Sequence, residues 1–125
     1  MARSQQRSRR KPSGGLYHSA RGKKQNELAG FSANTRLAKE NKRKTTRILG
    51  SNVKQALLTA GFVNVADAKG KANKTEILNV IENPANPHLV RRNIITKGAI
   101  VETKLGKVRI TSRPGQEASI NGVLV

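Results

Sequence analysis

Residues 91–113 read "RRNIITKGAIVETKLGKVRITSR", and this stretch decides the fold class. After the paired arginines, apolar and polar residues alternate through "AIVET" and "KVRITS", which is the two-residue period of strands with one buried face. The residues between these two runs, Lys104-Leu105-Gly106, fit the turn of a hairpin. The stretch therefore predicts two antiparallel strands preceded by a pair of cations.

Similar short runs fill the chain from residue 45 onwards. "TTRIL", "VKQALLT", "FVNVAD" and "ASINGVLV" are β-prone, and "TEILNVIE" is β-prone but also compatible with a short helix. Turn signals such as "GSN", "AG" and "NPANP" separate these runs, and "RPGQ" has the Pro-Gly order that a type II turn favours. About six or seven short strands predict an all-β fold, with a small barrel-like body over residues 45–125.

The composition is strongly cationic. The 125 residues include 25 Lys and Arg against 7 Asp and Glu, a formal net charge of +18. A charge of this size costs self-repulsion and suits a polyanionic partner, most often nucleic acid and next an anionic membrane surface. One tyrosine and two phenylalanines are too few for a platform that stacks single-stranded bases. The composition therefore favours a folded, phosphate-rich partner.

Residues 1–44 are predicted to be a basic N-terminal extension, largely irregular and ordered on RNA. Up to Lys24 the chain has 8 cations, no acid and almost nothing to bury, so it cannot offset its ordering entropy alone. A solvated tail is the alternative, and phosphate binding is favoured over it. Gly14-Gly15 fits either a flexible joint or a close approach of backbone to phosphate. Further along, "RLAKENKRKTTR" is compatible with a helix that has a thin apolar stripe.

Several classes of site lack the residues they need. The chain has no cysteine, and its two histidines, His18 and His88, are seventy positions apart, so no metal site and no cofactor are expected. Ser13 and Ser112 have no neighbouring base, and no acids pair at a useful spacing. No phosphate-binding glycine motif, secretory signal or apolar run of about 18 residues is present. The sequence therefore indicates neither an enzyme with a small-molecule substrate nor a membrane protein.

Three positions on the predicted body are candidate contacts. Arg91-Arg92-Asn93 is either an exposed strand end or a grip on phosphates, with guanidinium forks and an amide as donors. Lys97 precedes Gly98 in a predicted turn and is expected to face the partner. Arg113 lies in the "SRPGQ" turn, where a groove contact and a solvated turn are both open readings.

The motifs "KPSGG", "RGKK", "NELAG" and "ANT", together with "ENPANPHLVRRNIITKGAIVET" and "VRITSRPGQ", carry a family resemblance. The chain resembles the small-subunit ribosomal protein eight of archaea and eukaryotes, the e-type family, in its archaeal branch. The resemblance covers nearly the whole chain. It implies a structural component of the small (30S) ribosomal subunit in the cytoplasm, with a β-barrel-like body and a basic extension. The implied partners are small-subunit ribosomal RNA, in its 5′ region, and neighbouring small-subunit ribosomal proteins.

The family contact roles and the cation pattern together give the predicted RNA-binding residues. The resemblance suggests Lys11, Gly14, Gly15, Arg21, Lys23, Lys24, Asn52, Lys54, Arg91, Arg92, Asn93 and Lys97. The cation pattern adds Arg7, Arg9, Arg10, Arg36, Lys42, Arg43, Lys44 and Arg113.

The chain departs from the family pattern at Gln5 and Gln6, where the family commonly has an aromatic, and within residues 26–31 and 50–56. Asn26 stands where the family commonly has tyrosine, and Ala56 where a basic residue is expected. Two other functions stay open at this point: a free nucleic-acid-binding regulator, and a basic lipid binder, which would need an amphipathic helix.

Overall fold

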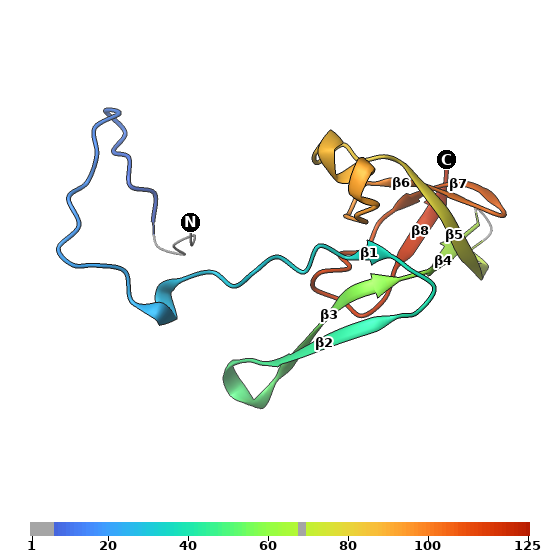
Figure 1. Cartoon of the computed structure of the whole chain (residues 1–125), viewed down its shortest axis with the longest axis horizontal. Helices are drawn as coiled ribbons and strands as arrows, with labels where there is room; N and C mark the ends of the chain where they lie inside the picture. The colour runs from blue at the N-terminus through green and yellow to red at the C-terminus, as the bar shows by residue number, and fades with distance from the viewer. Residues whose placement is uncertain (1–6, 68–69) are drawn as a thin grey trace. The chain divides into compact units, whose positions relative to one another are not determined.

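The computed structural model describes residues 7–67 and 70–125 (Figure 1). Residue contacts divide the chain into two compact units, Met1–Ser32 and Ala33–Val125. The sequence placed its boundary between residues 44 and 45, which falls inside the second unit and within a strand.

The first unit contains a small hairpin stabilised by backbone hydrogen bonds. Arg10 and Leu16 form an antiparallel bridge, and the Tyr17 N–H donates to the Arg9 carbonyl over 2.8 Å. The turn of this hairpin is closed by the Gly14 N–H, which donates to the Lys11 carbonyl over 2.9 Å. Gly14 has a φ of +86°, a conformation that glycine adopts without strain. A single 3₁₀ turn, η1 (Gln25–Glu27), follows.

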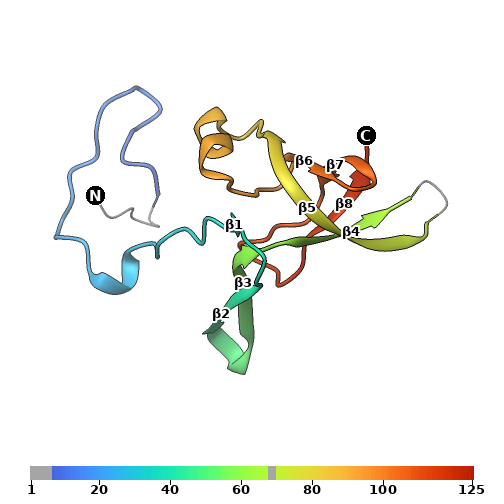
Figure 2. The same cartoon turned by 45° about the vertical axis from the view of Figure 1, so that its right-hand side comes forward.

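The second unit is built from strands and two 3₁₀ segments (Figures 1 and 2). In chain order they are β1 (Arg36–Leu37), β2 (Lys42–Arg47), η2 (Leu49–Ser51), β3 (Val53–Ala60), β4 (Phe62–Ala66), β5 (Ala72–Glu82), η3 (Pro87–Arg92), β6 (Ile100–Thr103), β7 (Gly106–Ile110) and β8 (Asn121–Leu124). β1, β3 and β2 form a sheet in that order, and β4 to β8 form a closed barrel. The all-β prediction is confirmed, and the described residues contain five strands in the barrel and three in the separate sheet.

Closure of the barrel depends on a parallel pairing between its first and last strands. β8 lies antiparallel to β7 and parallel to β4, with Val65 opposite Gly122. A Cβ on Gly122 would lie 2.4 Å from Val108 Cγ1, so only glycine lets β7 and β8 approach this closely. The predicted hairpin of β6 and β7 is confirmed, and Gly106 completes its turn with a φ of +125°. Closure leaves no free strand edge in the barrel.

The sheet and the barrel share one hydrophobic core. Val63, Val101 and Val108 of the barrel are fully buried, and Leu57 and Ala60 of β3 belong to the same cluster. Gly61 alone separates β3 from β4, so the chain passes from the sheet directly into the barrel. The sheet is therefore anchored in the core and extends from it, as Figure 2 shows for β2 and β3.

The β-type reading of "TEILNVIE" is confirmed, since this run is part of a long strand, β5, paired with β4 and β6. Two other local expectations were wrong. The segment "RLAKENKRKTTR", considered compatible with a helix, forms β1 and β2 because β3 lies between these strands and pairs with both. The "RPGQ" turn is not type II, because Gly115 does not adopt a positive φ. Instead, the N–H groups of Gln116 and Glu117 both donate to the Arg113 carbonyl over 2.9 Å, as in a turn of helix.

Candidate nucleic-acid interface

A basic element of the second unit is exposed along its whole length: the hairpin of β2, η2 and the start of β3, residues 42–54, which we call the basic hairpin. Every residue of β2 is exposed. Gly50 and Ser51 adopt positive φ at the tip. Asn52 closes this turn, since its carbonyl accepts from the Ile48 N–H over 2.9 Å and its side-chain amide donates to the Leu49 carbonyl over 3.3 Å. The hairpin carries five cations: Lys42, Arg43, Lys44, Arg47 and Lys54.

The charge of the basic hairpin is not compensated locally. Residues 41–66 contain no Asp or Glu. Each of its cations lies opposite a neutral residue, as Thr46 opposite Lys54 and Ala56 opposite Lys44, so no two cations face each other directly. Neither ion pair found in the described residues involves this hairpin. These side chains are therefore free to meet an external anion.

A second basic group lies at the end of η3. Arg91 and Arg92 occupy its last turn, where cations interact favourably with exposed helix carbonyls, and Asn93 ends it with a φ of +49°. The Asn93 carbonyl accepts from the Leu37 N–H over 2.9 Å, so β1 runs beside the end of η3. Arg36 of β1 is exposed and thus sits on the segment adjacent to the arginine pair.

Asn83 holds the loop that carries this pair, and the sequence reasoning missed it. Its side chain is buried and donates to the Ile94 carbonyl over 3.3 Å. Its amide oxygen accepts from the Thr96 hydroxyl over 2.9 Å and from the Ala85 N–H over 3.1 Å. The signal was present in "NPANP", because asparagine before proline often caps its own turn.

Lys97 lies where the sequence placed it. The Ala99 N–H donates to the Thr96 carbonyl over 3.2 Å, which closes a turn with Lys97 and Gly98 at its centre. Gly98 has a φ of +86°, as the third position of a type II turn requires. Lys97 and Arg113 are both exposed.

Cations of the first unit contact neighbours within that unit. The Arg7 guanidinium lies 3.9 Å and the Lys11 ammonium 5.4 Å from the centre of the Tyr17 ring. The Arg10 guanidinium donates to the Gly14 carbonyl over 2.9 Å. The cations thus cluster around one small hairpin, with Tyr17 as its only aromatic contact among the residues described there.

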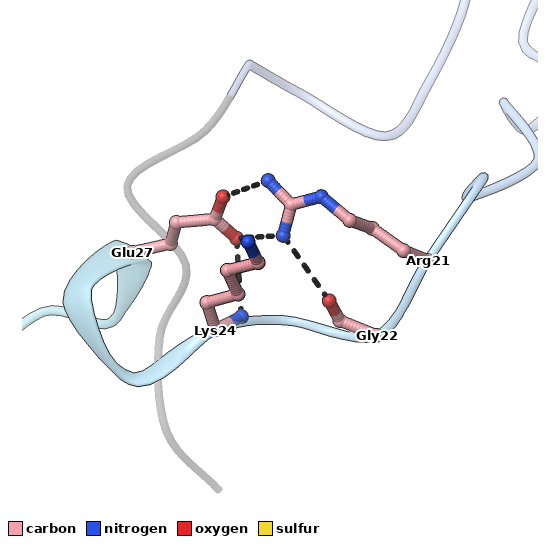
Figure 3. A network of polar contacts seen from close by, with 4 residues as sticks. All are labelled: Arg21, Gly22, Lys24 and Glu27. Carbon is pink, nitrogen blue, oxygen red and sulfur yellow. Dashed lines mark hydrogen bonds and ion pairs between the residues drawn. The ribbon is translucent and has the colours of Figure 1, made fainter.

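Arg21 is the exception in this unit, because it is paired with an acid (Figure 3). Its guanidinium donates to both carboxylate oxygens of Glu27, one of them over 3.1 Å, and to the Gly22 carbonyl over 3.4 Å. The Lys24 N–H donates to the same carboxylate over 3.2 Å. The hydrogen bond to Glu27, and then its charge, raise the pKa of Arg21. A phosphate at Arg21 would have to compete with this carboxylate.

Two lysines of the β6–β7 hairpin lie beside acids. Lys104 forms an ion pair of 2.7 Å with Glu76, and its hydrogen bond and charge lower the pKa of that carboxyl. Lys107 lies directly opposite Glu102 in the β6–β7 register. Cations with no acid opposite them in the strand register gather on the basic hairpin, and two more, Lys74 and Arg109, lie on the barrel.

Two other kinds of site are not seen in the part of the chain that is described. Within residues 7–67 and 70–125, His, Asp and Glu side chains form no group of three that could hold a metal ion. No helix in these same ranges has the length and apolar character needed to cross a membrane.

A family model provides the decisive comparison: the model of ribosomal protein S8e matches residues 4–125. The chain belongs to the ribosomal protein S8e family. This confirms the resemblance on which the sequence interpretation relied, and it places the chain in a family of ribosomal structural proteins rather than enzymes.

Archaeal relatives agree with this assignment over their whole length. The "Small ribosomal subunit protein eS8" of Methanobrevibacter smithii is 50% identical over 126 residues and covers 100% of both chains. Its counterpart in Methanocorpusculum labreanum is 49% identical over 122 residues, 97% of each chain. The protein of Methanococcus aeolicus is 46% identical over 122 residues, 97% of this chain and 95% of its own.

Proposed function

We propose that this S8e family member is a structural component of the small ribosomal subunit in the cytoplasm. It binds the subunit's ribosomal RNA through phosphate and shape contacts and lies beside other small-subunit proteins. The observation that carries this proposal is the accumulation of cations without acidic neighbours on the second unit. Such cations project from the basic hairpin and the end of η3, whereas Lys104 and Lys107 of the β6–β7 hairpin lie beside acids.

The mechanism is neutralisation of RNA phosphates by lysine and arginine, with release of condensed counterions. Duplex RNA hides its base edges in a deep, narrow groove, so recognition there relies on the backbone, the 2′-hydroxyl groups and the shape of the helix. The core under β3 and the Asn83 network hold the cations on rigid segments, so little side-chain and loop freedom is lost on contact.

The N-terminal extension completes the proposed interface. Its cations supply further phosphate contacts, and the extension orders along the RNA. The residues assigned in this extension are Arg7, Arg9, Arg10, Lys11, Gly14, Gly15, Arg21, Lys23 and Lys24. We further propose that the target lies in the 5′ region of the small-subunit RNA.

Filter binding to separate transcripts of the 5′, central and 3′ regions of the small-subunit RNA tests both proposals. We expect retention of the 5′ transcript at salt concentrations that abolish retention of the other two. Equal, weak binding to all three transcripts would contradict the 5′ assignment. Absence of the protein from small subunits purified in high magnesium would contradict the ribosomal role and favour a free regulator.

Replacing Arg91 and Arg92 by alanine tests the site at η3. Both side chains are exposed, so the melting temperature is expected to stay unchanged while the affinity for the 5′ transcript falls. Leu105→Ala is the matched control, because Leu105 is an exposed turn residue at the opposite end of β6. Unchanged affinity of the double variant would remove these arginines from the interface.

A further inference from the structure

A pocket of about 160 Å³ opens where the sheet meets the barrel. Its base is formed by core residues, Leu57 and Ala60 of β3 and Ile120 before β8, all at most 3% exposed. Around them lie one aromatic ring, two cations and two amides: Phe62, Arg43, Lys74, Asn41 and Asn64. The pocket is far smaller than the roughly 300 Å³ at which sites for whole small molecules begin. Its size suits a single planar group.

The chemistry of these side chains matches the requirements of an unstacked RNA base. Such a base is held by stacking on an aromatic ring or a guanidinium plane and by hydrogen bonds to its polar edge. Phe62 is half-buried and supplies the ring, and Arg43 supplies the guanidinium. A platform for several bases needs several aromatics, whereas one base needs only one.

Both amides have hydrogen-bonding capacity to spare. The Asn41 Oδ1 accepts from the Gly61 N–H over 3.2 Å, and its Nδ2 has no partner among the described residues. The Asn64 Nδ2 donates to Asn121 Oδ1 over 3.1 Å, and its own Oδ1 has no partner in the same set. The pocket thus presents one amide donor and one amide acceptor. Every RNA base carries both a donor and an acceptor on its Watson–Crick edge, so these two amides fit the hydrogen-bonding groups of any of the four bases.

The two cations of the pocket are placed to bind the phosphate attached to such a base. The Lys74 ammonium lies 4.8 Å from the centre of the Phe62 ring, over its face, and is itself exposed. A base that stacks on this ring takes the place of the ammonium, which then pairs with the adjoining phosphate. Arg43 belongs to both the pocket and the basic hairpin, so the pocket is continuous with the surface proposed to bind RNA.

We propose that this pocket binds one extruded base of the small-subunit RNA. This inference rests on the proposed function, because it needs the basic hairpin to lie against RNA. It assigns to Phe62, Asn41 and Asn64 a contact with a base, in addition to the phosphate contacts described above.

The test uses the full-length chain bound to the complete small-subunit RNA of its own organism, probed with dimethyl sulfate and a carbodiimide. These reagents modify unpaired Watson–Crick edges. We expect the wild-type protein to protect one unpaired base. Phe62→Leu should restore its reactivity and weaken binding by about 5- to 150-fold, which corresponds to the ~1–3 kcal/mol of one stacked base. Phe62→Tyr keeps the ring and should retain both protection and affinity.

The outcomes separate this inference from the proposed function. If wild type binds the RNA with steep salt dependence but protects no unpaired base, the pocket proposal is overturned while the proposed function stands. If Phe62→Leu keeps the protection, or if a photoreactive phenylalanine at position 62 crosslinks in small subunits to a protein instead of RNA, the proposal is also overturned. Retained circular dichroism and melting temperature of Phe62→Leu show that its loss of protection is local. Should that variant not fold, Asn64→Ala, at an exposed position, is expected to restore reactivity instead.

Discussion

Replacing the five cations of the basic hairpin by glutamine should change the salt dependence of RNA binding by a calculable amount. For a protein that neutralises Z phosphates of a duplex, the logarithm of the affinity falls with the logarithm of the salt concentration with a slope of about −0.9Z. All five side chains are exposed and none lies opposite an acid, so each is counted as one contact. The slope should therefore become less steep by about 4.5, or by about 3.5 on single-stranded RNA, where each contact contributes about 0.7. The substituted residues are Lys42, Arg43, Lys44, Arg47 and Lys54.

This difference is large enough to measure by filter binding. Between 50 and 200 mM salt, a slope change of 4.5 means that wild type loses about 500-fold more affinity than the variant. The fold should not be affected, since exposed substitutions of this kind usually change the free energy of unfolding by less than about 0.5 kcal/mol. Thermal denaturation of both proteins checks this assumption.

A matched control separates these cations from net charge alone. Glutamine at Lys104 and Lys107 removes two charges that lie beside acids on the barrel. If only cations that contact RNA phosphates contribute to the salt dependence, this control should change the slope by less than about 1, the contribution of a single phosphate contact. The reasoning would be refuted by a hairpin variant whose slope equals that of wild type, or by a control whose slope changes as much per charge as the hairpin variant.

Three further predictions concern the body. Gly61→Ala should lower the free energy of unfolding by about 1–3 kcal/mol in urea denaturation, because the added Cβ would lie 2.5 Å from a backbone oxygen of the β1–β2 connection. Gly30→Ala meets no atom within 4 Å and should cost much less. Thr35→Val should also lower the free energy of unfolding by about 1–3 kcal/mol, because the buried Thr35 hydroxyl donates over 2.6 Å to the Leu57 carbonyl, which would lose this hydrogen bond. A chemical denaturation midpoint equal to that of wild type would contradict this. Since Lys104 lowers the folded-state pKa of Glu76, the ion pair stabilises the fold above the ordinary pKa of about 4.3, and this contribution is lost as the pH falls through the lower folded-state value. The difference in melting temperature between wild type and Glu76→Gln should accordingly shrink as the pH is lowered, and a difference that stays constant as the pH falls would argue against the pair as its cause.

The strands were predictable where the chain itself carries the two-residue period. The β6–β7 hairpin has alternating residues and a glycine in its turn, so both its existence and its position followed from the sequence. Only the end of β2 followed, from the β-prone run "TTRIL", because all six residues of this strand are exposed and it has no buried face to create a period. Its strand conformation comes from pairing with β3, which is a tertiary effect.

The candidate site was predictable in its charges and not in its geometry. The acid-free run of residues 41–66 was visible in the sequence, as were Arg91 and Arg92. The pocket was not, because Phe62 and Lys74 come together only through the β4–β5 pairing, and Asn41 lies beside them through its hydrogen bond with the Gly61 N–H. Residue types alone did not reveal which lysines lie beside acids.

The direct continuation of β3 into β4 has a consequence for assembly. Since Leu57 and Ala60 of β3 lie in the common core, the basic hairpin and its sheet cannot separate from the barrel without exposing apolar surface. If RNA holds the basic hairpin as proposed, we therefore expect cooperative protection to extend to strands outside the proposed contact surface. Amide protons of β7 and β8 should exchange more slowly in the assembled subunit than in the isolated chain, even though these strands lie outside the proposed contact surface.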